Sequence, residues 1–221
     1  MNNFGIISYS LWGNNIKYII GAHRNIELAK EFFPEWKVRI YVSTNTNFTY
    51  ESDNLEIVYR TESQSQEGCF WRFEACDSDD TVIVRDLDDR LSKRHRFVVD
   101  EWLKSDKDIH IIRDHPNHVY PVMAGLWGCR KGILRGISTH ISNWNNKDYY
   151  TTDQDFLRNL IYSRNIDKSL IHDDFHKNIG VERNINMHRE NYEFLGDSFD
   201  ENDKRFESYW KIIESYKNYK L

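Results

Sequence analysis

The run of residues 81–90, TVIVRDLDDR, constrains the fold more than any other part of the sequence. Its first four residues are all β-branched, which predicts a buried β-strand. The strand runs directly into Asp86-Leu87-Asp88, and in open α/β sheets ligands bind just beyond the carboxyl ends of the strands. Two carboxylates there suit Mg²⁺ or Mn²⁺, and such an ion in turn holds phosphates. A polar turn that merely closes a strand would have the same sequence, so the rest of the chain has to decide between these interpretations.

The composition is that of a globular protein, because hydrophobic residues make up 39% of the 221 residues and charged residues 29%. This length suffices for one domain with a substantial core, and no internal repeat or linker rich in proline or glycine divides the chain. We therefore predict a single domain over residues 1–221. The net charge of −5, with lysine and arginine dispersed along the chain, argues against a nucleic-acid-binding surface.

Neither a membrane span nor a secretion signal is expected from the sequence. No apolar run approaches the roughly 18 residues of a membrane helix, and the first ten residues lack a basic segment followed by a long apolar one. The three cysteines, Cys69, Cys76 and Cys129, form no C-x-x-C pair, which argues against a disulfide framework or a zinc site. We predict a soluble cytoplasmic protein.

Strand-like and helix-like patterns alternate along the chain. Strands are predicted at residues 4–9, 38–42, 55–59, 81–84, 108–113, 122–129 and 169–171. Helices are predicted at residues 16–33, 69–76, 93–104, 131–141, 153–165 and 203–219. Pro34 ends the first helix, Ser92 caps the third, and Thr152 with Asp155 predicts a capping box at the fifth. The alternation favours a mostly parallel sheet built from βαβ units, with the last helix packed on it.

Polar groups suited to chemistry lie at the ends of three of the predicted elements. They are Asp86 with Asp88, Asp153-Gln154-Asp155, and His172. Two carboxylates and one imidazole, completed by phosphate oxygens and water, would hold Mn²⁺. Simpler explanations exist for each group, since acidic residues complement the start of a helix and a histidine at a strand end is commonly structural.

Taken together, these features resemble a GT-A-fold glycosyltransferase, and they are similar to the small single-domain members found in bacterial polysaccharide loci and in large DNA viruses. The resemblance spans roughly residues 4–174. It is carried by SLWGNN at 10–15, FWRF at 70–73, VIVRDLD at 82–88, AGLWG at 124–128, DQDFL at 153–157 and a late histidine. It implies an α/β fold of the GT-A type, an α/β/α sandwich with a mostly parallel central sheet.

The resemblance implies a metal site at the D-x-D motif. In that family the motif binds a divalent ion, Mn²⁺ or Mg²⁺, and through it the diphosphate of a nucleotide sugar. Asp86 would then face the ribose and the metal, and Asp88 would be the main metal ligand. His172 matches the third ligand that the family takes from late in the chain, although His176 competes for this role.

The resemblance also assigns residues to the donor. Asp153 and Gln154 match a D-Q pair that lies beside the donor sugar. The implied donor-binding residues are Ser10, Leu11, Trp12, Arg72, Arg85, Asp86 and Gly125. At Gly125 the strand pattern is interrupted, which predicts a close approach by a ligand or by backbone.

The expected activity is metal-dependent transfer of a hexose from a nucleoside diphosphate, UDP by preference, to a hydroxyl of a glycan or glycoprotein. An inverting enzyme would need Asp155 or Asp153 as base, whereas a retaining one needs Gln154 and Asp153 to stabilise the donor face. The D-Q match favours retention. Two alternatives are a non-catalytic nucleotide-sugar or carbohydrate-binding module of the same fold and a haloacid-dehalogenase-type phosphatase. The phosphatase fits less well, because its D-x-D motif usually follows the first strand.

Overall fold

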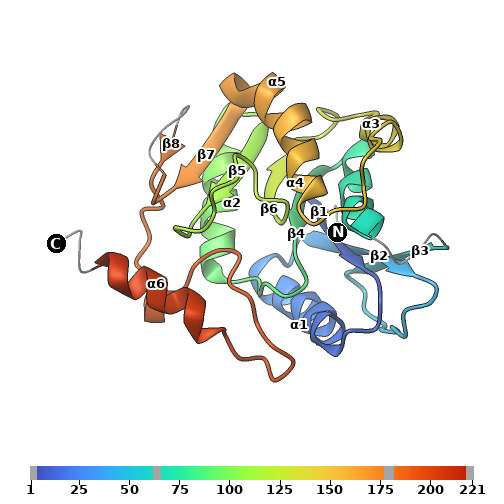
Figure 1. Cartoon of the computed structure of the whole chain (residues 1–221), viewed down its shortest axis with the longest axis horizontal. Coiled ribbons are helices and arrows are strands. Elements are labelled where there is room, and N and C mark those ends of the chain that lie inside the picture. The colour runs from blue at the N-terminus through green and yellow to red at the C-terminus, as the bar shows by residue number, and fades with distance from the viewer. Residues whose placement is uncertain (1–3, 62–65, 177–181, 218–221) are drawn as a thin grey trace.

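The computed structural model describes residues 4–61, 66–176 and 182–217. They form an eight-stranded sheet in the order β3-β2-β1-β4-β6-β5-β7-β8, covered by helices as Figure 1 shows. The strands are β1 (Gly5–Leu11), β2 (Trp36–Ser43), β3 (Leu55–Arg60), β4 (Thr81–Arg85), β5 (Ile109–Arg113), β6 (Leu126–Cys129), β7 (Ser169–Asp173) and β8 (Glu182–Arg183). All neighbouring strands pair in parallel except β6, which is antiparallel to both β4 and β5. The predicted α/β class with a mostly parallel sheet is confirmed.

The helical segments connect these strands. They are α1 (Ile16–Phe32), η1 (Gln66–Asp77), α2 (Lys93–Lys104), α3 (Ile137–Ser142), α4 (Thr152–Leu157), η2 (Arg158–Tyr162), α5 (Ser163–Asn165), η3 (Ile166–Lys168), η4 (Glu190–Tyr192) and α6 (Glu207–Lys217). Among the described residues, no helix is long and apolar enough to cross a membrane.

Alternating side chains of the central strands divide between two hydrophobic cores. On β1, Ile6 belongs to the core that also contains η1 and α4, whereas Ile7 belongs to the core formed with α1 and α2. This alternation follows from the two-residue repeat of a strand. It requires apolar residues at successive positions of a strand covered on both faces, as in residues 81–84. The layers are therefore helix, sheet and helix.

Local signals set the ends of α1 and α2 as predicted. The Asn15 side chain accepts a hydrogen bond from the Lys17 amide at the start of α1, and the helix ends at Phe32, before Pro34. Ser92 caps α2, where its hydroxyl accepts a bond from the His95 amide. These caps satisfy amides that a helix end leaves without a partner.

Four sequence expectations are wrong in detail. The helix predicted at 131–141 is reduced to α3, because Gly132 and Gly136 adopt φ values of 73° and 89°, which a helix does not contain. The strand predicted at 122–129 shortens to β6. The capping box at residue 152 is absent, since the Thr152 hydroxyl instead donates to the Asn146 carbonyl at 2.5 Å. The predicted helix at 203–219 begins later, as α6, and positions 218–219 lie outside the described residues.

The C-terminal segment packs beside α1 and the D-x-D loop, although they are far apart in sequence (Figure 1). The Phe199 amide donates to the Asp88 carbonyl at 2.9 Å, and Arg24 of α1 lies 2.9 Å from Asp203. Ile213 of α6 is 3% exposed. The C-terminal segment therefore contacts both the D-x-D loop and α1.

Asp114, which follows β5, connects the C-terminal segment to α2. Its carboxylate accepts bonds from Arg94 of α2 at 2.7 and 3.1 Å, from Arg189, and from the Leu195 amide at 2.9 Å. Burial by itself would raise the pKa of Asp114, but Arg189 and Arg94 outweigh burial and hold that pKa below its usual value.

Replacing Asp114 with asparagine should therefore lower the free energy of unfolding by about 3–5 kcal/mol, because the buried Arg94 and the partly exposed Arg189 lose a counter-charge. Urea denaturation at pH 7 measures this. The lowered pKa means that the contribution is complete above the unfolded-state pKa of about 3.9 and disappears as the pH falls through the folded-state value. The gap between the two proteins should consequently close below about pH 4, and a gap that is independent of pH would contradict this origin.

Candidate active site

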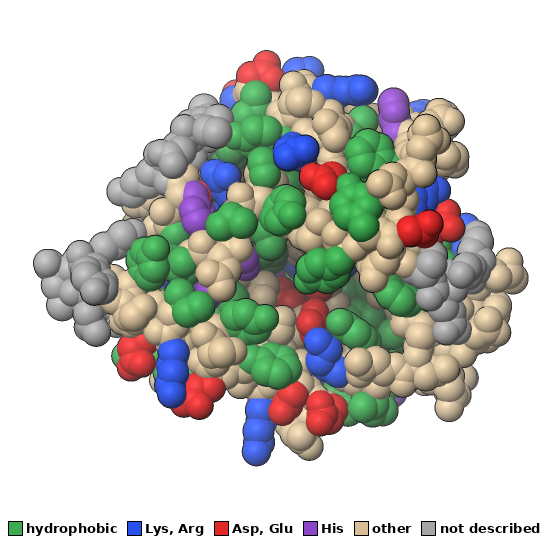
Figure 2. All heavy atoms as spheres, in the orientation of Figure 1, with side chains coloured by type: hydrophobic (Ala, Val, Ile, Leu, Met, Phe, Trp, Pro, Cys, Tyr) green, Lys and Arg blue, Asp and Glu red, His purple; other side chains and the backbone are tan. Residues whose placement is uncertain are grey.

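A cavity of about 750 Å³ opens at the carboxyl ends of β1 and β4. Figure 2 shows this face, where hydrophobic side chains surround a hollow with acidic side chains on its floor. Because β6 is antiparallel to β4, its first residue, Leu126, also reaches the cavity. The site is thus where open α/β sheets place ligands.

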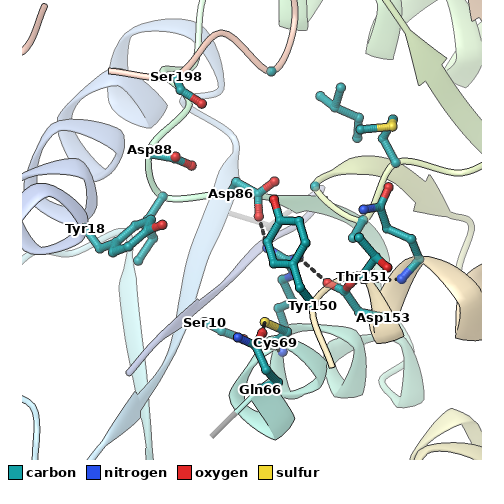
Figure 3. A pocket seen from close by; sticks show the side chains of 18 of the residues that line it. Ser10, Tyr18, Gln66, Cys69, Asp86, Asp88, Tyr150, Thr151, Asp153 and Ser198 are labelled. Atoms are coloured by element: carbon teal, nitrogen blue, oxygen red, sulfur yellow. Dashed lines mark hydrogen bonds and ion pairs between the residues drawn. The ribbon is translucent and has the colours of Figure 1, made fainter. Parts of the chain in front are cut away.

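The structure brings most of the predicted site residues together. Those that line the cavity are Ser10, Leu11, Trp12, Arg72, Asp86, Asp88, Gly125, Asp153 and Gln154. They come from the end of β1, from η1, from the loop after β4, from the loop before β6 and from α4. Figure 3 shows the facing carboxylates of Asp86, Asp88 and Asp153.

Arg72 joins the two acidic clusters. Its guanidinium contacts the Asp86 carboxylate through Nη1 and lies 3.1 Å from the Asp153 carboxylate through Nη2. Its backbone is held to β1, because the Arg72 amide donates to Ser10 Oγ at 2.9 Å and Ser8 Oγ donates to the Arg72 carbonyl at 2.7 Å. Burial alone would lower the pKa of Arg72, but Asp86 and Asp153 outweigh it, and the pKa is raised. Arg72 is therefore a permanent cation between two carboxylates.

Asp153 is held largely out of water at the start of α4. Its Oδ1 accepts a bond from the Gln154 amide at 2.9 Å, and its side chain is 10% exposed. Burial raises the pKa of Asp153, Arg72 lowers it and Asp86 raises it again, so that the result is above the usual value. The amide oxygen of Gln154 is buried and has no hydrogen-bond partner within the described part of the chain.

The D-x-D carboxylates differ in their surroundings. The Asp86 side chain is 47% exposed, whereas that of Asp88 is 18% exposed and lies 2.9 Å from Lys17 Nζ. Burial raises the pKa of Asp88, as does Asp86, while Lys17 opposes them. A Cβ atom at Gly125 would lie 2.0 Å from Asp86 Oδ2. The close approach predicted at Gly125 is thus made by Asp86, and any larger residue there would displace this carboxylate.

Asp86 and Asp88 fit a Mg²⁺ or Mn²⁺ ion in their chemistry, because both present hard oxygen atoms to the cavity. Over residues 4–61, 66–176 and 182–217, no three His, Cys, Asp or Glu side chains are grouped closely enough to hold a metal ion. An ion at Asp86 and Asp88 would therefore take its other ligands from phosphate and water, as Mg²⁺ commonly does.

His172 is not at this site, which corrects its interpretation as the third metal ligand. It lies within β7, fully buried, where His110 Nε2 is 2.8 Å from its Nδ1 and Glu101 Oε2 is 3.1 Å from its Nε2. Both ring nitrogens are thus engaged. The competing His176 contacts the His115 carbonyl at 3.2 Å, and neither histidine lines the cavity.

Arg85 and Asp155 also point away from the cavity. The Arg85 guanidinium is 1% exposed and donates to the Val84 and Trp127 carbonyls at 2.7 and 3.1 Å, and burial lowers its pKa to about 10. Strand alternation turns Arg85 into the sheet when Asp86 faces the cavity. The Asp155 carboxylate accepts a bond from the Tyr149 hydroxyl at 2.7 Å, on the outer side of α4.

Sequence reasoning missed a second wall of the cavity. Its members are His115, His118, Phe194 and Tyr209. Tyr150, which sequence reasoning also missed, lies beside Asp86 and Asp153 (Figure 3). The HPNHVY run after β5 resembles other polar strand ends, so position alone could have marked His115 and His118 as candidates. Phe194 and Tyr209 carried no such signal, because only the fold brings them to the cavity. The Tyr150 side chain is 82% exposed. The next residue, Thr151, has a φ of 77°, which is unusual for a β-branched residue.

The comparisons with known proteins address the fold. No protein-family model and no curated protein matches the sequence. Among solved structures, the chain is similar to a glycosyltransferase involved in the glycosylation of the major capsid of PBCV-1. The TM-score is 0.52 and the identity 14%, over 76% of this chain and 82% of that one. The fold is GT-A-like. This confirms the resemblance and the fold class inferred from the sequence.

Two other solved structures align less closely to this GT-A-like chain. Glucosyl-3-phosphoglycerate synthase from Mycobacterium tuberculosis, in complex with Mn²⁺, uridine diphosphate and phosphoglyceric acid, aligns at a TM-score of 0.46 and 12% identity, over 76% of this chain and 68% of that one. An active-site mutant of LgtC aligns at a TM-score of 0.46 and 11% identity, over 76% and 72%.

Replacing Arg72 with methionine should raise the pKa of Asp153 further and lower the free energy of unfolding by about 2–3 kcal/mol. This is less than for a fully buried pair, because Asp86 reaches water. Carbon-13 NMR titration of the aspartate carboxyls and urea denaturation measure the two effects. The control is Arg158→Met, which removes an exposed partner of Asp155 and should change neither quantity. An unchanged Asp153 pKa in Arg72→Met would show that Arg72 does not hold this carboxylate ionised.

Proposed function

We propose that this protein is a glycosyltransferase that moves a sugar from a nucleoside diphosphate to a hydroxyl of a glycan or glycoprotein, with Mn²⁺ or Mg²⁺ at Asp86 and Asp88. The observation that carries the proposal is the meeting of the D-x-D carboxylates, Arg72 and the Asp153-Gln154 pair in one cavity of a GT-A-like fold. That the PBCV-1 protein of similar fold is a glycosyltransferase supports it.

The divalent ion, when bound, would neutralise charge that develops on the diphosphate as the bond to the sugar breaks. Ser10, Leu11 and Trp12 form the wall at the end of β1, where the nucleoside would lie. Trp12 packs over Gly68, at which a Cβ would come within 2.3 Å of the indole, so its ring is held in place. We propose a UDP-hexose as the preferred donor.

Retention of configuration is the course that we propose. Cleavage of the donor bond leaves positive charge on the sugar carbon and its ring oxygen. The unpartnered amide oxygen of Gln154, with its partial negative charge, and the buried carboxylate of Asp153 are the groups that would stabilise this charge. Asp155, the alternative base for an inverting reaction, is turned out of the cavity. Arg72 lies between Asp153 and Asp86 and favours the ionised form of Asp153, so it acts as a positioning residue for this carboxylate.

The D-x-D assignment predicts that Asp88→Ala abolishes Mn²⁺-dependent hydrolysis of a UDP-hexose, with a loss of at least about 100-fold, comparable to the removal of one preorganised charge-stabilising group. The chain provides a matched control in its other D-x-D, at Asp77 and Asp79. Asp79 is 64% exposed and paired with Arg135, so Asp79→Ala should keep full activity. Unchanged activity in Asp88→Ala would refute the metal assignment.

Binding without turnover would instead support the non-catalytic module. In that case a nucleotide sugar should raise the melting temperature, and at 100 times its dissociation constant it should add about 2.7 kcal/mol to the free energy of unfolding. Neither hydrolysis of the nucleotide sugar nor transfer of the sugar to an acceptor should be detected.

The contact between Lys17 and Asp88 leads to a prediction about the affinity for the metal ion. Because Lys17 Nζ is the direct partner of Asp88, an arriving cation has to displace it. Lys17→Met should therefore bind Mn²⁺ about fivefold more tightly in calorimetry on the free protein, given the modest strength of a partly exposed pair. Lys30→Met breaks a Lys–Glu pair on the same helix but away from the cavity, and should leave Mn²⁺ affinity unchanged. Equal or weaker binding by Lys17→Met would contradict the prediction.

A further inference from the structure

His118 stands on the second wall of the cavity with a fixed tautomer. It is 7% exposed, and its Nδ1 accepts a hydrogen bond from the Asp114 amide at 3.1 Å. An amide nitrogen always carries its hydrogen, so Nδ1 must present a lone pair. A neutral imidazole with a lone pair on Nδ1 carries its proton on Nε2. The backbone thus makes Nε2 a donor.

The protonation state agrees with this geometry. Burial lowers the pKa of His118 to about 3, His115 lowers it as well, and Asp114 opposes them. The ring is consequently neutral across the physiological range. A neutral Nε2–H can neither accept a proton from a substrate nor bind a metal through its lone pair, because that nitrogen has none to give.

The Nε2 edge is kept open toward the cavity by Gly196. A Cβ atom at this position would lie 3.3 Å from His118 Cε1 and 3.4 Å from Nε2, and would cover the donor. Gly196 has a φ of 85°, which disfavours any side chain there. Within the described residues, no hydrogen bond reaches Nε2. The donor is therefore available to a ligand or to water, either of which would satisfy it.

Aromatic side chains lie beside the His118 ring. Phe194 lies edge-on to its ring, with 6.0 Å between ring centroids. His115 packs against Phe194 at 4.4 Å and donates through Nε2 to the Tyr209 carbonyl at 3.1 Å, which holds Tyr209 at the rim. The Nδ1 atom of His115 accepts from the Asn117 amide at 3.0 Å, so its tautomer is fixed in the same way.

The two walls therefore differ in chemistry. The charged groups Arg72, Asp86 and Asp153 lie on one side, where phosphate and developing positive charge belong. The wall with His118 offers aromatic faces and an uncharged donor, which match the apolar ring face and the hydroxyl oxygens of a neutral sugar.

We propose that His118 donates its Nε2–H to a hydroxyl oxygen of a pyranose held against Phe194 and Tyr209, and so selects the sugar. The inference rests on the proposed function. The sugar is that of either the donor or the acceptor, which share this chemistry, and kinetics distinguish the two sources.

The first test needs no turnover. Nitrogen-15 NMR of the imidazoles should show His118 with a protonated Nε2 and no titration between pH 5 and 8. Methyl pyranosides, added with UDP and Mn²⁺, should shift the Nε2–H resonance. A proton on Nδ1, an imidazolium at pH 7, or no shift with any methyl pyranoside would overturn the proposal.

The second test uses two substitutions. His118→Asn keeps an acceptor near the Asp114 amide but withdraws the donor from the cavity, and should lower kcat/KM about 3- to 10-fold, as expected for one neutral hydrogen bond. His118→Gln retains a donor at the Nε2 position and should recover most of the activity. His140→Asn, which changes an exposed histidine on α3 outside the cavity, is the control.

The kinetics of His118→Asn show whether His118 binds the sugar of the donor or that of the acceptor. A rise in the KM for the acceptor, with unchanged hydrolysis of the UDP-hexose, identifies the acceptor. A parallel loss in hydrolysis identifies the donor sugar. Wild-type kinetics for His118→Asn in both reactions would overturn the proposal while leaving the proposed function intact. If the wild-type protein itself hydrolysed no nucleotide sugar, the proposed function would fail, and the NMR result would still decide whether His118 binds a pyranose.

Discussion

The contact of Arg72 with Asp86 and Asp153 is the interaction on which the site depends. Three carboxylates, those of Asp86, Asp88 and Asp153, share one cavity, and their mutual repulsion would favour protonation of at least one of them. The buried guanidinium offsets the repulsion between Asp86 and Asp153, and Lys17 opposes the repulsion at Asp88. Because Ser8 and Ser10 hold the Arg72 backbone to β1, the cation is placed by the sheet itself. The first strand thus determines where the acidic groups of β4 and α4 meet.

The second wall depends on a different ionic centre. Asp114 binds Arg94, Arg189 and the Leu195 amide, so it joins α2, the end of β5 and the C-terminal segment in one place. Its own backbone amide fixes the tautomer of His118. A buried carboxylate is costly unless it is fully paired, and this pairing is what places Phe194 beside the cavity. Asp114 therefore has two roles: its carboxylate holds the ionic centre together, and its backbone amide orients His118 on the second wall.

The two ionic centres, at Arg72 and at Asp114, support different parts of the cavity. The first, at Arg72, holds carboxylates that would face charge in the proposed reaction. The second, at Asp114, supports the uncharged wall that would contact a sugar in our proposal. The antiparallel β6 lies between them, with Gly125 giving Asp86 room and Leu126 packing under Gly196.

Local sequence predicted most of the strands and helices and the position of the D-x-D motif just after β4. The β-branched run before Asp86, the cap at Ser92 and Pro34 after α1 act through neighbouring residues, so they could be interpreted without the fold. The resemblance to a GT-A-fold enzyme predicted that the carboxylates after β4 and at the start of α4 belong to one site. Only the tertiary structure decided which histidines face the cavity, because His172 and His118 differ in their distant partners and not in their local sequence. The antiparallel β6, the inward turn of Arg85 and the arrival of Phe194 and Tyr209 arise from long-range packing, which no local pattern contains.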